Sequence, residues 1–155
     1  MLRFPRIDAA ELETILRREA PQADQAQIHA AIAAAEGSPG RALDFVGQEL
    51  GKVHRLMQQM LEGGDGGLSL RGELGEEVGA RPDRERLQAV IELARSALAG
   101  QLADALRERQ ERIIAAHQAL GQLAARAPIY NFDPGLLVME IGGLLASAAL
   151  PREAA

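Results

Sequence analysis

Apolar residues recur along most of the chain at three- and four-residue intervals, which is the spacing of amphipathic helices. Only residues 1–7 alternate in the manner of a short extended segment. The pattern therefore predicts an all-α fold in two parts. A small unit of three short helices is expected at residues 1–47, and a bundle of roughly five helices at residues 48–155.

Residues that favour helix ends mark the boundaries of these elements. An aspartate or a serine stands just before several of the apolar stripes, at the expected N-cap position. Its side chain can accept a hydrogen bond there from a backbone N–H that has no partner within the helix. Gly37 stands where a helix commonly ends in a left-handed residue. The predicted N-caps are Asp8, Asp24, Ser38, Ser69, Asp83 and Asp133, and the predicted inward-facing residues of the third helix are Ala42, Leu43 and Val46.

Two interruptions divide the second part of the chain. The run Gly63–Gly67 cannot continue a helix and is interpreted as a flexible connector. It lacks the following Lys-Ser/Thr and the preceding buried strand of a phosphate-binding loop. A single helix from Asp83 to Ala124 would be about 60 Å long, too long for a small domain. We therefore expect a break within Leu106–Gln110.

The last predicted helix, residues 136–150, is apolar on nearly all sides. Such a helix must be covered on more than one side, by helices of the same chain or by another subunit. Gly142 and Gly143 lie inside it and indicate either the close approach of a neighbouring backbone or a local kink. The residues expected to be buried or to form an interface are Leu137, Ile141, Leu144 and Leu145.

Charge gives little sign of a nucleic-acid surface. The net charge is −5, and Lys52 is the single lysine among 17 basic residues. The arginines alternate with glutamates, as in Arg107-Glu108-Arg109 and Glu111-Arg112. This alternation is typical of a solvated helix face rather than of a stripe that binds phosphates.

Catalytic and metal-binding groups are sparse. The chain has no cysteine, and its three histidines are far apart in sequence. Ser38 has no nearby histidine, and adjacent glutamates such as Glu76 and Glu77 point in different directions on a helix. We expect no catalytic residue, no metal and no cofactor, and therefore not an enzyme by itself. Because a secretory signal and an apolar stretch of about 20 residues are both lacking, a cytoplasmic protein without membrane contact is expected.

The segment Gly37-Ser38-Pro39-Gly40-Arg41-Ala42-Leu43 resembles the G-S-x-x-x-A-L element in the helical lid domain of AAA+ clamp-loader subunits. In members that hydrolyse ATP, the fourth position is an arginine that reaches the nucleotide phosphates. Here that position is Gly40, and the arginine has moved to Arg41. This departure is similar to the delta-prime subunits of bacterial DNA polymerase III, which generally do not hydrolyse ATP.

Two further segments carry the same resemblance. Leu2-Arg3-Phe4 before the first helix is similar to the passage from the ATPase domain into the lid. Residues 127–133, with Tyr130 and Asp133, followed by Leu136-Leu137-Val138, resemble the turn before the final helix of the collar domain. Residues 63–110 resemble the clamp-loader subunits only in their helical character.

The resemblance implies the C-terminal portion of a longer subunit, from lid to collar, with Met1 as an engineered or internal start. Its partners would be the gamma/tau and delta subunits, and it would scaffold the loading of the sliding clamp onto primer-template DNA in replication. The parent complex would be the DNA polymerase III holoenzyme. Arg41 would contact a neighbouring subunit, DNA or solvent.

A different interpretation is a stand-alone helical adaptor that binds a partner helix in a groove. The length and the acidic pI of the chain suit this alternative equally well, but it leaves the Gly37–Leu43 and Tyr130–Asp133 similarities unexplained. A helical enzyme of unfamiliar design is a third, weaker interpretation.

Overall fold

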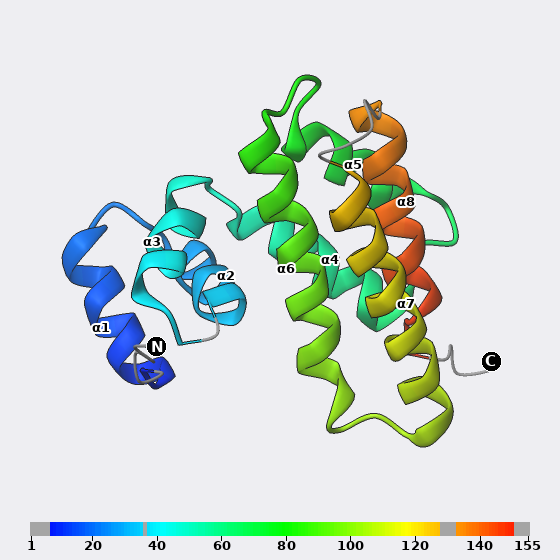
Figure 1. Cartoon of the computed structure of the whole chain (residues 1–155), viewed down its shortest axis with the longest axis horizontal. Helices are drawn as coiled ribbons and strands as arrows, with labels where there is room; N and C mark the ends of the chain where they lie inside the picture. Colours follow the sequence, from blue (N-terminus) through cyan, green and yellow to red (C-terminus); the bar gives the residue numbers. More distant parts are fainter. Residues whose placement is uncertain (1–6, 36, 128–132, 151–155) are drawn as a thin grey trace. The chain divides into compact units, whose positions relative to one another are not determined.

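The computed structural model describes residues 7–35, 37–127 and 133–150 (Figure 1). In these ranges the chain forms eight helices and no strand, as the apolar spacing predicts. It divides into two compact units, Met1–Lys52 and Val53–Ala155. The helices are α1 (Ala9–Glu19), α2 (Gln25–Ala35), α3 (Pro39–Gly47), α4 (Gly51–Gly63), α5 (Ser69–Val78), α6 (Arg84–Leu102), α7 (Arg107–Arg126) and α8 (Pro134–Ser147).

Most of the predicted helix caps are formed. Asp8 accepts a hydrogen bond from the backbone N–H of Glu11 at 2.8 Å and begins α1. Asp83 does the same for Arg86 at 2.7 Å and begins α6. Each of these bonds satisfies a backbone donor that the first helical turn leaves free. The sequence pattern therefore located these helix starts correctly.

The first unit packs α2 against α3 and α1 against both. Its core includes Leu12, Leu16 and Ile28. The prediction for α3 was correct for Ala42 and Val46, which are buried, and wrong for Leu43, which is 36% exposed. Phe45 is buried instead, because the residue three positions after Ala42 lies on the same helical face, whereas the next residue is rotated by about 100°.

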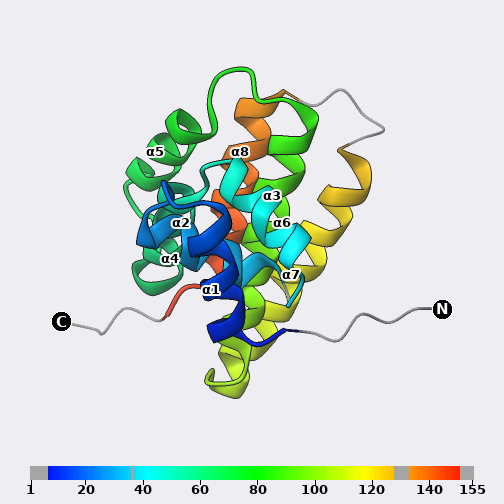
Figure 2. The same ribbon diagram turned by 90° about the vertical axis from the view of Figure 1, so that its left-hand side faces the viewer.

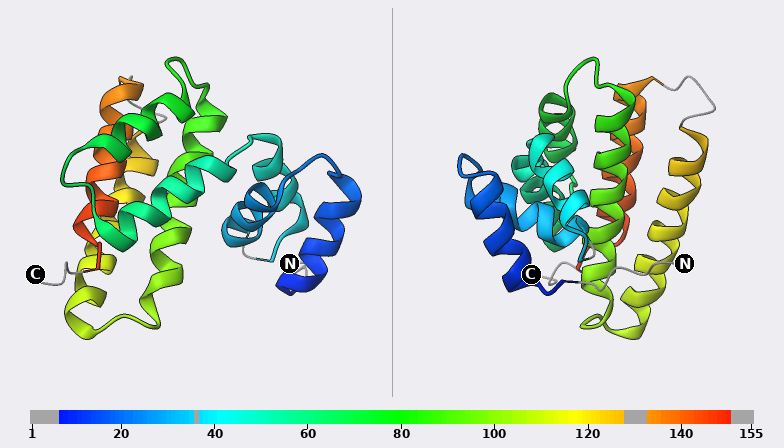
Figure 3. Two further views of the ribbon diagram at one scale, coloured as in Figure 1. Left: turned by 180° about the vertical axis from the view of Figure 1, so that it is seen from behind. Right: turned by 60° about the vertical axis from the view of Figure 1, so that its left-hand side comes forward.

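In the second unit, α6 and α7 form a hairpin, and α8 packs against α5, α6 and α7 (Figures 1 and 3). The break between α6 and α7 falls at Ala103–Leu106, so the prediction of Leu106–Gln110 was about one turn too late. The reason is that the Leu106 carbonyl already accepts the first hydrogen bond of α7, from the Gln110 N–H at 2.8 Å. Figure 2 shows α6, α7 and α8 from a second direction.

Candidate functional site

Helix α8 carries most of the predicted interface residues. Asp133 caps it by accepting hydrogen bonds from the Gly135 and Leu136 N–H groups at 2.8 and 3.1 Å. Pro134 occupies its first turn, where no N–H is needed. Tyr130, the other predicted residue of this turn, lies outside the described residues.

The buried face of α8 belongs to the core of the second unit. Leu137, Ile141 and Leu145 are at most 3% exposed, which fits a structural role. Leu144, predicted to be buried with them, is only half-buried. The opposite face remains open, because Leu136 is 73% exposed and Met139 is 40% exposed. Residues Leu136 and Met139, the open face of α8, are thus the apolar surface that this helix offers to a partner.

The glycine pair in α8 makes room for a side chain rather than for a backbone. A Cβ atom on Gly142 would lie 2.6 Å from Cγ of Arg71, a residue of α5. On Gly143 the nearest atoms, also of Arg71, would be 3.9 Å away. Gly142 is therefore the position at which α5 and α8 come together through the aliphatic stem of one arginine.

Asp65 holds the other end of that arginine. Its buried carboxylate lies 3.4 Å from the Arg71 Nε and accepts hydrogen bonds from the Leu70 and Arg71 N–H groups, both at 3.0 Å. Asp65 thereby caps α5, and the prediction that Ser69 does so was wrong, because Ser69 is the first helical residue. The glycine-rich run therefore contains a buried carboxylate that caps α5.

A buried arginine joins the ends of three helices in the second unit. Arg109 of α7 is 6% exposed. Its Nε donates to the Ala148 carbonyl at 3.1 Å, and its Nη2 donates to the Leu61 carbonyl at 3.4 Å and to Oε1 of Gln101 at 2.9 Å. Cations at carbonyl ends of helices are favourable, because those ends carry partial negative charge.

Arg112 completes this arrangement, one turn further along α7. Its Nη1 donates to the carbonyls of Ser147 and Ala149 at 3.2 and 3.1 Å. Burial, and secondarily the positive charge of Arg112, lower the pKa of Arg109 from its ordinary value. Arg109 and Arg112 together hold the carboxyl-terminal end of α8 against α7.

The interpretation of this segment as a solvated face was therefore wrong for Arg109. A signal for its burial was present in the sequence: Arg109 precedes Ile113 by four residues and continues the stripe of Ile113, Ala116 and Leu120. The alternation of charge signs concealed it, because burial on a helix follows the 3.6-residue period rather than the identity of adjacent residues.

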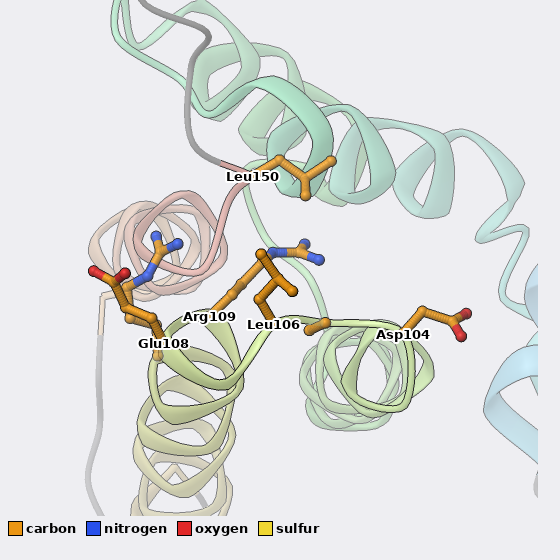
Figure 4. Close-up of a pocket in the computed structure, with 7 residues that line it drawn as sticks. Asp104, Leu106, Glu108, Arg109 and Leu150 are labelled. Carbon is orange, nitrogen blue, oxygen red and sulfur yellow. The ribbon is translucent and has the colours of Figure 1, made fainter.

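Beside this arginine lies an open pocket with a volume of about 250 Å³. Leu106 and Leu150 form its apolar walls and are 83% and 45% exposed. Figure 4 shows the Arg109 side chain between these two leucines, with Asp104 and Glu108 toward opposite sides. The complete lining is Asp104, Ala105, Leu106, Glu108, Arg109, Arg112 and Leu150.

The lid-like motif lies in the other compact unit. Ser38 caps α3 by accepting a hydrogen bond from the Arg41 N–H at 3.4 Å, and Gly37 has the left-handed φ of 82° expected at a helix end. Gly40 and Arg41 are exposed. The structure therefore forms the predicted turn between α2 and α3.

Among the described residues, no cluster of three or more histidine, aspartate and glutamate side chains could hold a metal ion. Within the same residues, no helix has the length and apolar character needed to span a membrane. Comparison with protein-family models, with curated proteins and with solved structures gave no match to this chain.

Proposed function

We propose that the chain is the lid and collar portion of a delta-prime-like clamp-loader subunit, and that it scaffolds subunit assembly without hydrolysing ATP. In this proposal α1–α3 form the lid and α4–α8 form the collar. The partners are gamma/tau-like and delta-like subunits, and the sliding clamp and primer-template DNA are engaged through the assembled complex. The chain itself supplies no catalytic group.

The open face of α8 is the observation that carries this proposal. Leu136 and Met139 leave apolar area in water on a helix whose other face is fully packed. Burying such area against a neighbour is favourable by about 25 cal/mol per Å². A collar that assembles side by side with other collars supplies that cover, and exposed apolar surface of this kind commonly marks a protein interface.

Three further features support the proposal. The division into units of three and five helices agrees with a lid followed by a collar. The Gly37–Ser38 turn has the tight helix-to-helix geometry that the lid element needs. Gly40 stands where a hydrolysing subunit would carry a phosphate-contacting arginine, which fits a subunit that does not hydrolyse ATP.

The test is the mass in solution of the full chain, alone and mixed with collar-containing clamp-loader subunits of the same organism. Light scattering after gel filtration at tens of micromolar measures it directly. We expect a stable mixed complex with the unmodified chain. Leu136→Glu and Met139→Glu should weaken the complex at least tenfold, because each places a charge in an apolar interface.

Ile114→Glu is the matched control, because Ile114 is also an exposed apolar residue, 46% exposed, but lies on α7. It should leave the complex intact. No association at these concentrations would overturn the collar scaffold and favour the stand-alone adaptor. Equal loss of the complex in all three variants would show that the open face of α8 is not the contact surface.

A further inference from the structure

The pocket between Leu106 and Leu150 has the size of a small ligand group. Its volume of about 250 Å³ is below the range of roughly 300–1,000 Å³ that is typical of sites for drug-sized molecules. The space suits one or two short aliphatic groups. Leu106 is the most exposed large apolar residue among the described residues, and it stands at this pocket.

Among the described residues, no acid forms an ion pair with Arg109. The groups that accept its hydrogen bonds are two backbone carbonyls and one side-chain amide, all neutral. Buried guanidinium groups are normally paired with a carboxylate, since a desolvated charge without a counter-charge is costly. Carbonyl ends of helices carry only partial negative charge. Among the described residues, the hydrogen bonds of Arg109 are made by its Nε and Nη2 atoms, and none is made by Nη1.

A second positive group reinforces this imbalance. Arg112 lines the same pocket and uses its Nη1 for backbone carbonyls, so its Nε and Nη2 have no partner among the described residues. The proximity of Arg112 contributes to the lowered pKa of Arg109. An anion in the pocket would offset both the desolvation of Arg109 and the repulsion between the two arginines.

The start of α7 adds donors at the same place. Leu106 occupies the N-cap position and makes no side-chain capping bond, so the first N–H groups of this 20-residue helix lack a side-chain acceptor. Such N–H groups and the helix dipole attract negative charge. Asp104 and Glu108 at the sides of the pocket favour a singly charged ligand over a doubly charged phosphate.

From these observations we propose that the Leu106–Leu150 pocket binds a carboxylate carried on a short aliphatic group. Arg109 and Arg112 hold the carboxylate, and the two leucines cover the aliphatic part. The ligand is either a free small carboxylic acid or the C-terminal residue of a peptide chain, since the two share this chemistry. This inference does not depend on the proposed role in a clamp loader.

The test is an NMR titration of the ¹⁵N-labelled full chain with isovalerate (3-methylbutanoate) and with its neutral amide, isovaleramide. We expect saturable shifts of the Leu106–Arg109 and Leu150 amide signals with isovalerate, at a dissociation constant on the order of 1–10 mM for a ligand of this size. The amide should bind at least tenfold more weakly. Inorganic phosphate should also bind more weakly than isovalerate.

Acetyl-glycyl-leucine distinguishes the two sources of the carboxylate. Binding at least fivefold tighter than that of isovalerate supports a peptide C-terminus, and equal binding supports a small acid. In both cases, acetyl-glycyl-leucine with its C-terminal carboxylate converted to an amide must bind more weakly than acetyl-glycyl-leucine itself. Shifts that do not saturate, or equal binding of acid and amide, overturn the proposal.

Variants that preserve the fold test the assigned contacts. Leu106→Ala should weaken isovalerate binding at least threefold, whereas Leu136→Ala, at a leucine that is 73% exposed on α8, should not change it. Glu108→Gln should tighten binding about two- to fivefold by removing a like charge. Glu111→Gln, outside the pocket lining, should not. Unchanged binding in both Leu106→Ala and Glu108→Gln would also overturn the proposal.

Discussion

Alanine substitution should stabilise the protein at Gly143 but not at Gly142, although the two glycines are adjacent in α8. Both have ordinary helical backbones, and neither has a positive φ. They differ in what a new methyl group would meet. At Gly142 the methyl carbon would lie 2.6 Å from Cγ of Arg71, whereas at Gly143 its nearest neighbours would be 3.9 Å away.

The magnitudes follow from two terms. Replacing glycine by alanine inside a helix gains about 1 kcal/mol, and Gly143→Ala should keep this gain. Gly142→Ala gains the same amount but forces an overpacked contact that costs about 1–3 kcal/mol. Arg71 cannot move away freely, because its Nε lies 3.4 Å from the buried carboxylate of Asp65. We therefore expect Gly142→Ala to be neutral or destabilised by up to about 2 kcal/mol.

Urea unfolding followed by far-ultraviolet circular dichroism measures both free energies. Hydrogen exchange at the α8 amides assigns the change to the second unit, since the two units need not unfold together. Gly143→Ala should raise the melting temperature of that unit by a few degrees, on the order of 2–6 °C. Equal stabilisation by both alanines would refute the packing argument and would mean that Arg71 yields to the methyl group without cost.

Other substitutions test separate parts of the structure. Leu145→Glu should cost at least about 3 kcal/mol of unfolding free energy by denaturant titration, because it buries a charge at a fully covered position, whereas Leu136→Glu should leave the monomer as stable as before. Asp65→Asn should cost about 1–3 kcal/mol and speed hydrogen exchange at the start of α5, since one cap acceptor and the ion pair are lost. Gly51→Ala should lower the melting temperature of the first unit, because its Cβ would lie 2.8 Å from the Gln27 backbone nitrogen, which cannot rotate away.

The sequence predicted helix caps correctly where the capping side chain bonds a backbone N–H close to it in the chain. The caps at Asp8, Asp83 and Asp133 depend on a side chain and an N–H two or three residues away. The same logic failed at Ser69, because the acceptor that caps α5 is Asp65, which comes from an earlier turn of the loop. Asp65 lies five and six positions before the N–H groups that it bonds, a separation that the usual N-cap spacing does not include.

The sequence pattern did not predict which residues of different helices contact one another. The glycines of α8 signalled a close approach, but nothing in the chain indicated that the approaching group is Arg71, 71 residues before Gly142. The open face of α8 was equally hidden. An apolar stripe reports that a residue prefers burial, while the fold decides which sides of the helix are covered. Leu136 and Leu137 are adjacent leucines, and one is exposed while the other is buried.

Several of the arginines bind the carbonyl ends of neighbouring helices. Arg86 donates from Nε and Nη2 to the carbonyls of Val78 and Glu77 at 3.0 and 2.8 Å, at the end of α5. At the end of α8, the Arg109 Nε donates to the Ala148 carbonyl, and the Arg112 Nη1 donates to the carbonyls of Ser147 and Ala149. Arg86 and Arg109 each reach two carbonyls from two different nitrogens, because the donors of a guanidinium form a planar fork, which a lysine ammonium does not offer. In each case an arginine near the start of one helix satisfies the carbonyl end of another helix. The bundle is therefore joined at helix ends by arginines as well as along its apolar stripes, and at Arg109 this joint leaves a buried positive charge beside an open pocket.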